Sequence, residues 1–93
     1  MPSEGSAEFQ AAAAKIQQLQ KMPDTETLKE IYALFKQVTV GDVTPADKPG
    51  FTDFQGKAKY AAREKIKGMS AEEAEQKYIA IVDRLVAEIG LKA

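Results

Sequence analysis

The chain has 93 residues, a formal net charge of −1 from 13 basic and 14 acidic residues, and neither cysteine nor histidine. This length predicts one domain over residues 1–93, and the near-neutral charge argues against general attraction to nucleic acid or anionic membranes. Without cysteine or histidine, disulfides, thiolate nucleophiles and the commonest metal ligand and general base are excluded, so catalysis is disfavoured.

The opening residues, MPSEGSAEF, are mostly polar and lack the apolar core that a secretory signal needs. No apolar run in the sequence approaches the ~20 residues of a membrane-spanning helix. We therefore expect an intracellular, cytoplasmic protein.

Two helices are predicted in the first half of the chain, where apolar residues recur at helical spacing. The first helix is expected to end before Met22-Pro23. The second begins after Asp24, which can cap it, and ends near Gly41. The apolar positions are Phe9, Ala12, Ala13, Ile16 and Leu19 in the first helix and Leu28, Ile31, Tyr32, Phe35 and Val38 in the second.

A loop rich in proline and glycine is predicted from Val43 to Phe51, without an element of its own. Its length predicts an overhand connection, which allows the second and third helices to run parallel. The third helix is expected between a capping Asp53 and Gly68. Its apolar positions are Phe54, Ala58, Ala61, Ala62 and Ile66.

The fourth helix has the clearest pattern, beginning with an S-x-x-E capping box at Ser70 and Glu73 and ending at Gly90. Its apolar stripe consists of Ala74, Tyr78, Ile81, Val82, Leu85 and Ile89. Four amphipathic helices without a competing strand pattern predict an all-α, antiparallel four-helix bundle in which each apolar stripe is buried.

Aromatic and cationic side chains are paired on the predicted second helix. Tyr32, Phe35 and Lys36 are three and four residues apart and therefore share one face. A phenol can donate a hydrogen bond to a phosphate and an ammonium can neutralise it, so the pattern indicates a ligand with a flat ring and a phosphate. The alternative is a core tyrosine beside a solvated lysine. The same combination recurs after the loop at Lys57, Lys59 and Tyr60.

The segment from Lys57 to Lys67 carries the highest local positive charge, and we expect Arg63, Lys65 and Lys67 to lie on a solvated helix face. Tyr78 lies in the apolar stripe of the fourth helix, where it can pack and also offer its hydroxyl, or serve the core alone. Without histidine no Ser/His/Asp arrangement is possible, so the expected chemistry is recognition.

Two motifs, YxLFKQxTVGD beginning at Tyr32 and KPGFxDFxGKAKY ending at Tyr60, resemble the acyl-CoA-binding protein family. The resemblance extends from Ala7 to Ile79. It implies a four-helix bundle of up-down-down-up topology with a long overhand loop between helices 2 and 3. It also implies a monomer that binds medium- to long-chain acyl-CoA esters non-covalently, without a cofactor, as an intracellular carrier and pool former. Expected partners are acyl-CoA esters and, transiently, acyl-CoA-using enzymes and membranes, but no nucleic acid.

The resemblance also implies ligand-binding positions. Tyr32, Lys36 and Lys59 would hold the ribose 3′-phosphate, and Tyr78 would contact the adenosine part. Residues expected to contribute less are Ala13, a small residue lining the site, and Ala33 and Leu34, which fall within the binding segment of the second helix.

Several positions depart from the family pattern. Gln17 and Gln55 stand where lysine is common, and the lost charges are expected to weaken head-group contacts. Phe35 stands where tyrosine is common, so it keeps a face for stacking on adenine but loses a hydroxyl. Tyr60 stands where tryptophan is common. Because the three residues expected at the 3′-phosphate are all present, we expect binding to persist.

Three other classes of function compete with a carrier. A helical protein-interaction domain would take a partner helix in its apolar groove, and its binding would not depend on Lys36 or Lys59. Nucleic-acid binding through the basic segment is disfavoured by the near-neutral net charge. An enzyme is the least favoured class, because 93 residues leave no room for a separate catalytic domain.

Overall fold

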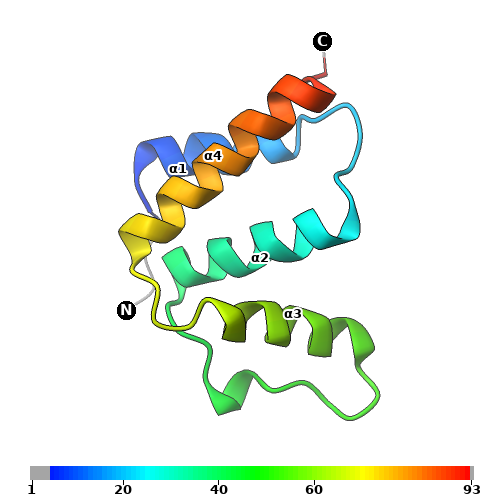
Figure 1. Ribbon diagram of the computed structural model, residues 1–93, viewed down its shortest axis with the longest axis vertical. Coiled ribbons are helices and arrows are strands. Elements are labelled where there is room, and N and C mark those ends of the chain that lie inside the picture. Colours follow the sequence, from blue (N-terminus) through cyan, green and yellow to red (C-terminus); the bar gives the residue numbers. More distant parts are fainter. Residues whose placement is uncertain (1–4, 93) are drawn as a thin grey trace.

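The computed structural model describes residues 5–92, which form four α-helices and one short 3₁₀-helix. The helices are α1 (Ala7–Ile16), α2 (Thr25–Thr39), η1 (Pro45–Asp47), α3 (Phe54–Lys65) and α4 (Ala71–Ile89). In Figure 1, α1 and α4 run in one direction and α2 and α3 in the other, which confirms the all-α, up-down-down-up prediction. The first four residues of the polar opening lie outside the described part.

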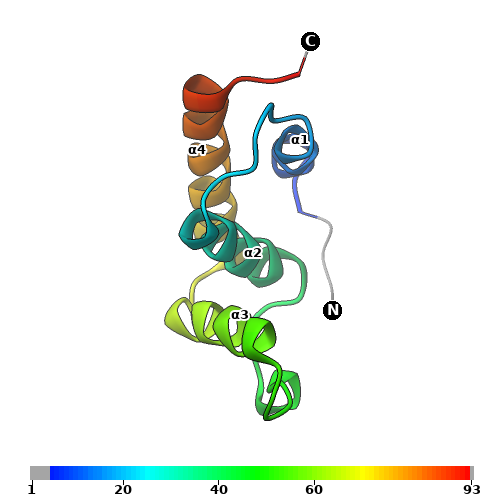
Figure 2. The same ribbon diagram turned by 90° about the vertical axis from the view of Figure 1, so that its right-hand side faces the viewer.

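The packing of the helices is uneven. α4 packs against both α1 and α2, whereas α3 packs mainly against α2. The molecule is therefore flat, with extents of 41 × 28 × 16 Å, and α3 forms one edge (Figure 2). The buried core is accordingly built from α1, α2, α4 and the segment after α1, and it consists of Phe9, Ala12, Leu19, Ile31, Leu34, Val38, Ala74, Tyr78, Val82 and Leu85.

Three predicted helix starts are confirmed by their caps. The side chains of Asp24, Asp53 and Ser70 each accept a hydrogen bond from the backbone N–H three residues later. These bonds satisfy donors that have no partner inside the helix. Of the predicted capping box, the hydrogen bond from the Glu73 N–H to the Ser70 hydroxyl is formed. The Glu73 carboxylate lies 3.9 Å from Lys77 Nζ.

α1 ends at Ile16, before Leu19, the last apolar position of the predicted first helix, and well before the predicted end at Met22-Pro23. Leu19 is buried, but it lies beyond the helix and forms an antiparallel bridge with Leu91. The Gln20 N–H donates to the Gly90 carbonyl, and the Lys92 N–H donates to the Gln18 carbonyl. Backbone pairing with the other end of the chain therefore replaces the last helical turn. The loop predicted from Val43 to Phe51 also differs from the prediction, because it contains the short helix η1.

α3 departs most from the sequence analysis. Arg63 was expected on a solvated face, but only 6% of it is exposed. Its guanidinium lies 3.6 Å from the Asp47 carboxylate and donates to the Gly41 carbonyl, because the loop after α2 folds across it. Phe54, expected in a buried stripe, is 75% exposed, because α3 packs mainly against α2 and lies at the edge of the molecule.

Asp42 joins the end of α2 to the link between α3 and α4. Its carboxylate accepts hydrogen bonds from Gln37 Nε2 at 2.7 Å and from the Gly68 N–H at 2.8 Å, and Gln37 Nε2 also donates to the Met69 carbonyl. The Gly68 N–H, and then the Gln37 amide, lower the pKa of Asp42 below its usual value. The ionised carboxylate therefore stabilises the folded chain.

We expect Asp42→Ala to lower the free energy of unfolding at neutral pH, measured by urea denaturation. Because the folded pKa is lowered, this stabilisation is present above about pH 4 and disappears as the pH falls through the folded value. The difference from the parent protein should therefore shrink in acid. Asp83→Ala, which removes an exposed carboxylate of α4, is the control. A loss of stability that is equal at neutral and acid pH would contradict this account of Asp42.

Candidate ligand-binding site

Two lysines converge on one phenol ring where α2 and α3 lie side by side. Lys36 Nζ lies 5.9 Å from the centre of the Tyr32 ring, and Lys59 Nζ lies 5.1 Å from it. Tyr32 and Lys36 are one turn apart on α2, and Lys59 comes from the parallel α3. Each ammonium is attracted by the ring, but like charges repel one another. An anion bound between the lysines would relieve that repulsion.

A small cavity opens beside this cluster. Its volume is about 190 Å³, which is room for several water molecules at ~30 Å³ each. It lies between α2, α3 and the loop that contains η1, and its lining includes Tyr32, Asp47, Pro49, Lys59, Tyr60 and Arg63. The two helices and the loop thus form a recess in which a group of phosphate size can meet tyrosine and lysine side chains.

Arg63 borders this recess, and the sequence analysis did not identify it as a candidate site residue. Its Nε is buried and has no hydrogen-bond partner among the described residues. The Thr44 backbone N–H, and to a lesser extent Arg63 and Lys36, hold the pKa of Asp47 below its usual value. The ionised Asp47 carboxylate therefore partly neutralises the positive charge of Arg63. The spacing of four residues between Lys59 and Arg63 was the available signal, since it places both on one face of α3.

An apolar groove continues from the same cluster along α2 and α3. Its volume is about 260 Å³, and it shares Tyr32 and Lys59 with the recess. Its other lining residues are Thr25, Leu28, Lys29, Gln55 and Ala58. The lining is mainly apolar, so this groove suits a flexible hydrocarbon chain whose charged end lies at the lysines.

Tyr78 and Phe35 meet within an aromatic cluster rather than at the lysines. The Phe9 ring lies 5.5 Å from Phe35 and 4.8 Å from Tyr78, measured between ring centres, and Phe35 and Tyr78 are 6.3 Å apart. Tyr78 is 3% exposed, and this burial raises the pKa of its hydroxyl. The packing expected for Tyr78 is confirmed, while its contact with a ligand stays a prediction. Phe35 is half-buried and keeps part of its surface accessible.

The other predicted site residues do not join the lysine cluster. Ala33 and Leu34 are buried because successive residues on a helix point about 100° apart, which turns them away from the face of Tyr32. Ala13 is half-buried against the core, and Gln17 is exposed at the end of α1. Of the secondary candidates, only Gln55 lines the groove that contains Tyr32 and Lys59.

Comparison with known proteins identifies the family. A family model described as acyl-CoA-binding protein matches residues 6–82. The chain belongs to the acyl-CoA-binding protein family. An acyl-CoA-binding protein homologue of Manduca sexta is 45% identical over 85 residues, covering 91% of this chain and 94% of the relative. A Drosophila melanogaster homologue is 49% identical over 83 residues, covering 89% of this chain and 95% of the relative.

Solved structures of acyl-CoA-binding proteins share the fold. The crystal structure of Oryza sativa acyl-CoA-binding protein 2 matches with a TM-score of 0.80 at 36% identity, covering 87% of this chain and 89% of that one. The solution structure of the yeast acyl-coenzyme A binding protein matches with a TM-score of 0.74 at 42% identity, covering 91% of this chain and 98% of that one. The helices and the loop of this family member therefore follow an architecture known from several organisms.

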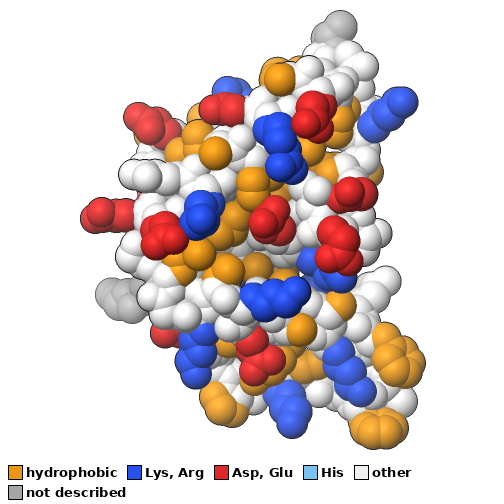
Figure 3. Space-filling model, in the orientation of Figure 1, with side chains coloured by type: hydrophobic (Ala, Val, Ile, Leu, Met, Phe, Trp, Pro, Cys, Tyr) orange, Lys and Arg blue, Asp and Glu red, His pale blue; other side chains and the backbone are white. Residues whose placement is uncertain are grey.

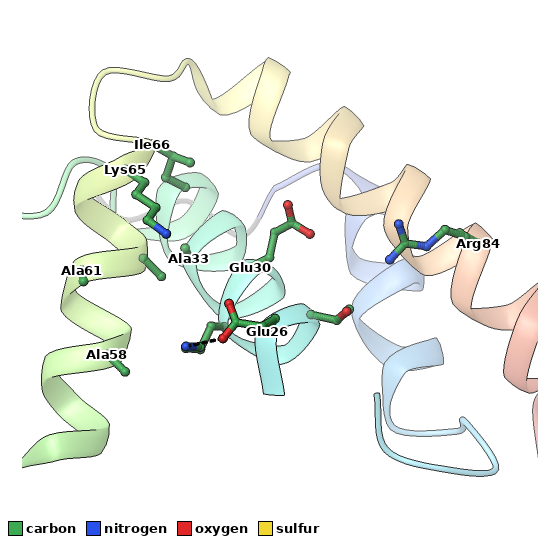
Figure 4. Close-up of a pocket in the computed structure, with 11 residues that line it drawn as sticks. Glu26, Glu30, Ala33, Ala58, Ala61, Lys65, Ile66 and Arg84 are labelled. Atoms are coloured by element: carbon green, nitrogen blue, oxygen red, sulfur yellow. Dashed lines mark ion pairs between the residues drawn. The ribbon is translucent and has the colours of Figure 1, made fainter. Parts of the chain in front are cut away.

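A larger cavity of about 500 Å³ lies on another side of this acyl-CoA-binding protein family member, between α2, α3 and α4 (Figure 4). Its apolar lining includes Ala33 and Ile66. The charges around it are mixed, since its lining contains the carboxylates of Glu26 and Glu30 together with Lys29, Lys65 and Arg84. Glu26 pairs with Lys29 at 2.8 Å. Among residues 5–92, no helix is long and apolar enough to cross a membrane.

Proposed function

We propose that the protein binds medium- to long-chain acyl-CoA esters non-covalently and acts as an acyl-CoA carrier and pool former. The observation that carries this proposal is the convergence of Lys36 and Lys59 on Tyr32 at the end of an apolar groove. A cationic cluster that continues into a hydrocarbon-lined groove has the two properties of the ligand, a phosphorylated head and an acyl chain.

Each part of the ligand is assigned to a part of this site. Tyr32, Lys36 and Lys59 hold the ribose 3′-phosphate, and Phe35 offers its accessible face to the adenine ring. Tyr78 supports Phe35 from the core and contacts the adenosine part through its edge. The acyl chain occupies the groove with Gln55, and Ala13 and Gln17 offer secondary contacts. Ala33 and Leu34 are buried and support α2 from the core.

The affinity for acyl-CoA is expected to depend on the length of the acyl chain. A charge-assisted hydrogen bond contributes roughly 1.5–3 kcal/mol, and each methylene removed from water contributes about 0.8 kcal/mol. Nanomolar binding requires about −12 kcal/mol, so the head group and the chain must both contribute after ordering costs are subtracted. Affinity should therefore rise with the length of the acyl chain until the groove is filled.

We further propose that the protein works without a cofactor and without catalysis, as a cytoplasmic monomer. The absence of histidine and cysteine removes the usual nucleophile and base for thioester hydrolysis. Its partners would be acyl-CoA-using enzymes and membranes, which it meets transiently while it releases or collects its ligand. A protein-interaction domain is less favoured, because a partner helix has no need of the lysine pair.

Isothermal titration with palmitoyl-CoA tests the proposal, with 3′-dephospho-palmitoyl-CoA, free CoA and free palmitate as parallel titrants. We expect one-to-one, submicromolar binding of palmitoyl-CoA and at least ~10-fold weaker binding of the dephospho ester, because one charge-assisted contact is worth about that factor. Free CoA and free palmitate should each bind more weakly than the ester. Equal affinity for the two esters, or no binding of either, would contradict the assignment.

A further inference from the structure

The arginine at the edge of the recess is buried but incompletely paired. Only 6% of Arg63 is exposed. Its Nη2 donates to the Gly41 carbonyl across 3.4 Å, which is long for a hydrogen bond, and its Nη1 lies 3.6 Å from Asp47 Oδ2, beyond hydrogen-bond distance. Its Nε has no hydrogen-bond partner among the described residues. A guanidinium has five N–H donors, so this one keeps binding capacity inside the protein.

The carboxylate beside this guanidinium forms its hydrogen bonds elsewhere. Asp47 Oδ2 accepts from the Thr44 N–H at 2.9 Å and from the Thr44 hydroxyl at 3.2 Å. A buried charged group normally has a close counter-ion and hydrogen bonds that satisfy its donors. The pairing of Arg63 with Asp47 is therefore loose, and a second anion would improve it.

Arg63 lines the same recess as two of the residues assigned to the phosphate. The recess of about 190 Å³ has Tyr32, Lys59 and Arg63 in its lining. Lys59 and Arg63 are four residues apart on α3, so they lie on one face of that helix. A phosphate in the recess therefore has Lys59 and, one helical turn further along, Arg63 as neighbours.

Attraction of an anion to this recess depends on the groups that line it. The whole chain carries a net charge of −1. Figure 3 shows basic and acidic side chains interspersed over one face of the molecule, so this face has no large region of a single sign. Coulomb attraction is strongest at short range and away from the screening of water. A buried guanidinium at the recess is therefore more effective than an exposed lysine at the same distance.

Asp47 acts against this attraction. It lines the recess together with Arg63, and it carries a negative charge where the phosphate would lie. Because Arg63 is the partner of Asp47 and a neighbour of the recess, the carboxylate and an entering phosphate compete for the same guanidinium.

We propose that Arg63 is a fourth residue of the 3′-phosphate site and that Asp47 weakens this site by competing for the guanidinium. The inference rests on the proposed function and deepens it, since it adds one residue to the three already assigned. When the phosphate enters the recess, the guanidinium turns from Asp47 toward it and donates charge-assisted hydrogen bonds to its oxygens. The planar guanidinium suits a phosphate, because two N–H groups can donate to two oxygens at once.

Arg63→Gln tests the contact with the phosphate by isothermal titration. We expect at least ~10-fold weaker binding of palmitoyl-CoA, because a charge-assisted hydrogen bond is worth about that factor. Binding of 3′-dephospho-palmitoyl-CoA should change little. Arg63→Lys keeps the charge without the planar fork and should lose less than Arg63→Gln. Lys65→Gln is the matched control, since it removes an exposed cation of α3 that does not line the recess, and it should bind both esters like the parent protein.

The ratio of the two affinities separates binding from a structural role. Arg63 also holds the loop after α2, so its loss can lower the free energy of unfolding, which urea denaturation measures. A loosened loop would weaken both esters together, whereas a lost phosphate contact weakens only the intact ester. Equal losses for the two esters, or parent-like affinity for both, would therefore overturn the role of Arg63.

Asp47→Asn tests the competition without disturbing the loop. Asparagine has nearly the same shape, and its side-chain oxygen can still accept the hydrogen bonds from Thr44. Palmitoyl-CoA should bind this variant several-fold more tightly than the parent protein, and the dephospho ester should bind both alike. In the Arg63→Gln background, Asp47→Asn should bring much less gain, because the group for which the two anions compete is absent.

Two results would contradict the competition. One is unchanged or weaker binding of palmitoyl-CoA by Asp47→Asn. The other is a full gain in the Arg63→Gln background, which would mean that Asp47 acts on the phosphate by its charge alone. Failure of the proposed function is distinguishable from both, since the parent protein would then bind the intact and the dephospho ester equally or bind neither.

Discussion

Replacing Lys36 and Lys59 together by alanine is expected to weaken palmitoyl-CoA binding by about 10²–10³-fold, since each charge-assisted contact with a phosphate contributes roughly 1.5–3 kcal/mol and solvent screening favours the lower end. Both ammonium groups lie within 6 Å of the centre of the Tyr32 ring, at 5.9 and 5.1 Å. Isothermal titration of the parent and variant proteins measures the change. The loss of two neighbouring like charges should leave the urea midpoint unchanged or slightly raised.

The 3′-phosphate provides a thermodynamic cycle for this prediction. With 3′-dephospho-palmitoyl-CoA, the parent protein and the double lysine variant should differ much less than with the intact ester, because the anion that the lysines bind is missing. Lys67→Ala is the matched control, since it removes a lysine that is exposed beyond the end of α3. Equal losses with both esters would mean that the two lysines hold another part of the head group.

Phe9→Ala is expected to lower the free energy of unfolding by about 3–5 kcal/mol, which is the usual cost of removing a large ring from a packed core. Phe9 is 1% exposed and contacts the rings of both Phe35 and Tyr78. A loss of this size is a large fraction of the stability of a small domain. Urea denaturation followed by circular dichroism measures it, with Phe51→Ala, which truncates an 88% exposed ring, as the control. Phe51→Ala should change the free energy of unfolding by less than ~0.5 kcal/mol.

A second substitution at Phe9 tests how the core supports the candidate site. Phe9→Leu keeps an apolar side chain and should preserve the fold, while it removes the ring on which Phe35 and Tyr78 pack. We expect palmitoyl-CoA to bind this variant several-fold more weakly, with affinity for the dephospho ester reduced in the same proportion, because the lysines are untouched. Parent-like affinity in Phe9→Leu would show that the aromatic cluster is structural alone.

Much of the fold could be predicted because it depends on interactions between residues that are close in the chain. The caps at Asp24, Asp53 and Ser70 are made three residues away, and the 3.6-residue period locates the buried face of α4 at Tyr78 and Leu85. Local spacing also placed Lys36 beside Tyr32 on one face of α2. The resemblance to acyl-CoA-binding proteins supplied the topology, which the periodicity alone left open.

Other features depend on segments that are far apart in the sequence. α1 stops at Ile16 because the chain after it pairs with Leu91 at the opposite end of the sequence. Arg63 is buried because the loop containing Asp47 folds across it, and Phe54 is exposed because α3 packs mainly on α2. No local propensity encodes these outcomes, so the pattern that worked for α4 failed for α3.

The candidate site combines both kinds of information. The amino-acid sequence by itself determined the helices, their caps, the absence of histidine and cysteine, and the pairing of a phenol with an ammonium on α2. Only the tertiary structure decided that Lys59 approaches the same ring, that the groove continues from it, and that Arg63 borders the recess. The physical reason is that helix formation follows from neighbouring residues, whereas a binding site requires side chains from helices whose relative placement is set by packing.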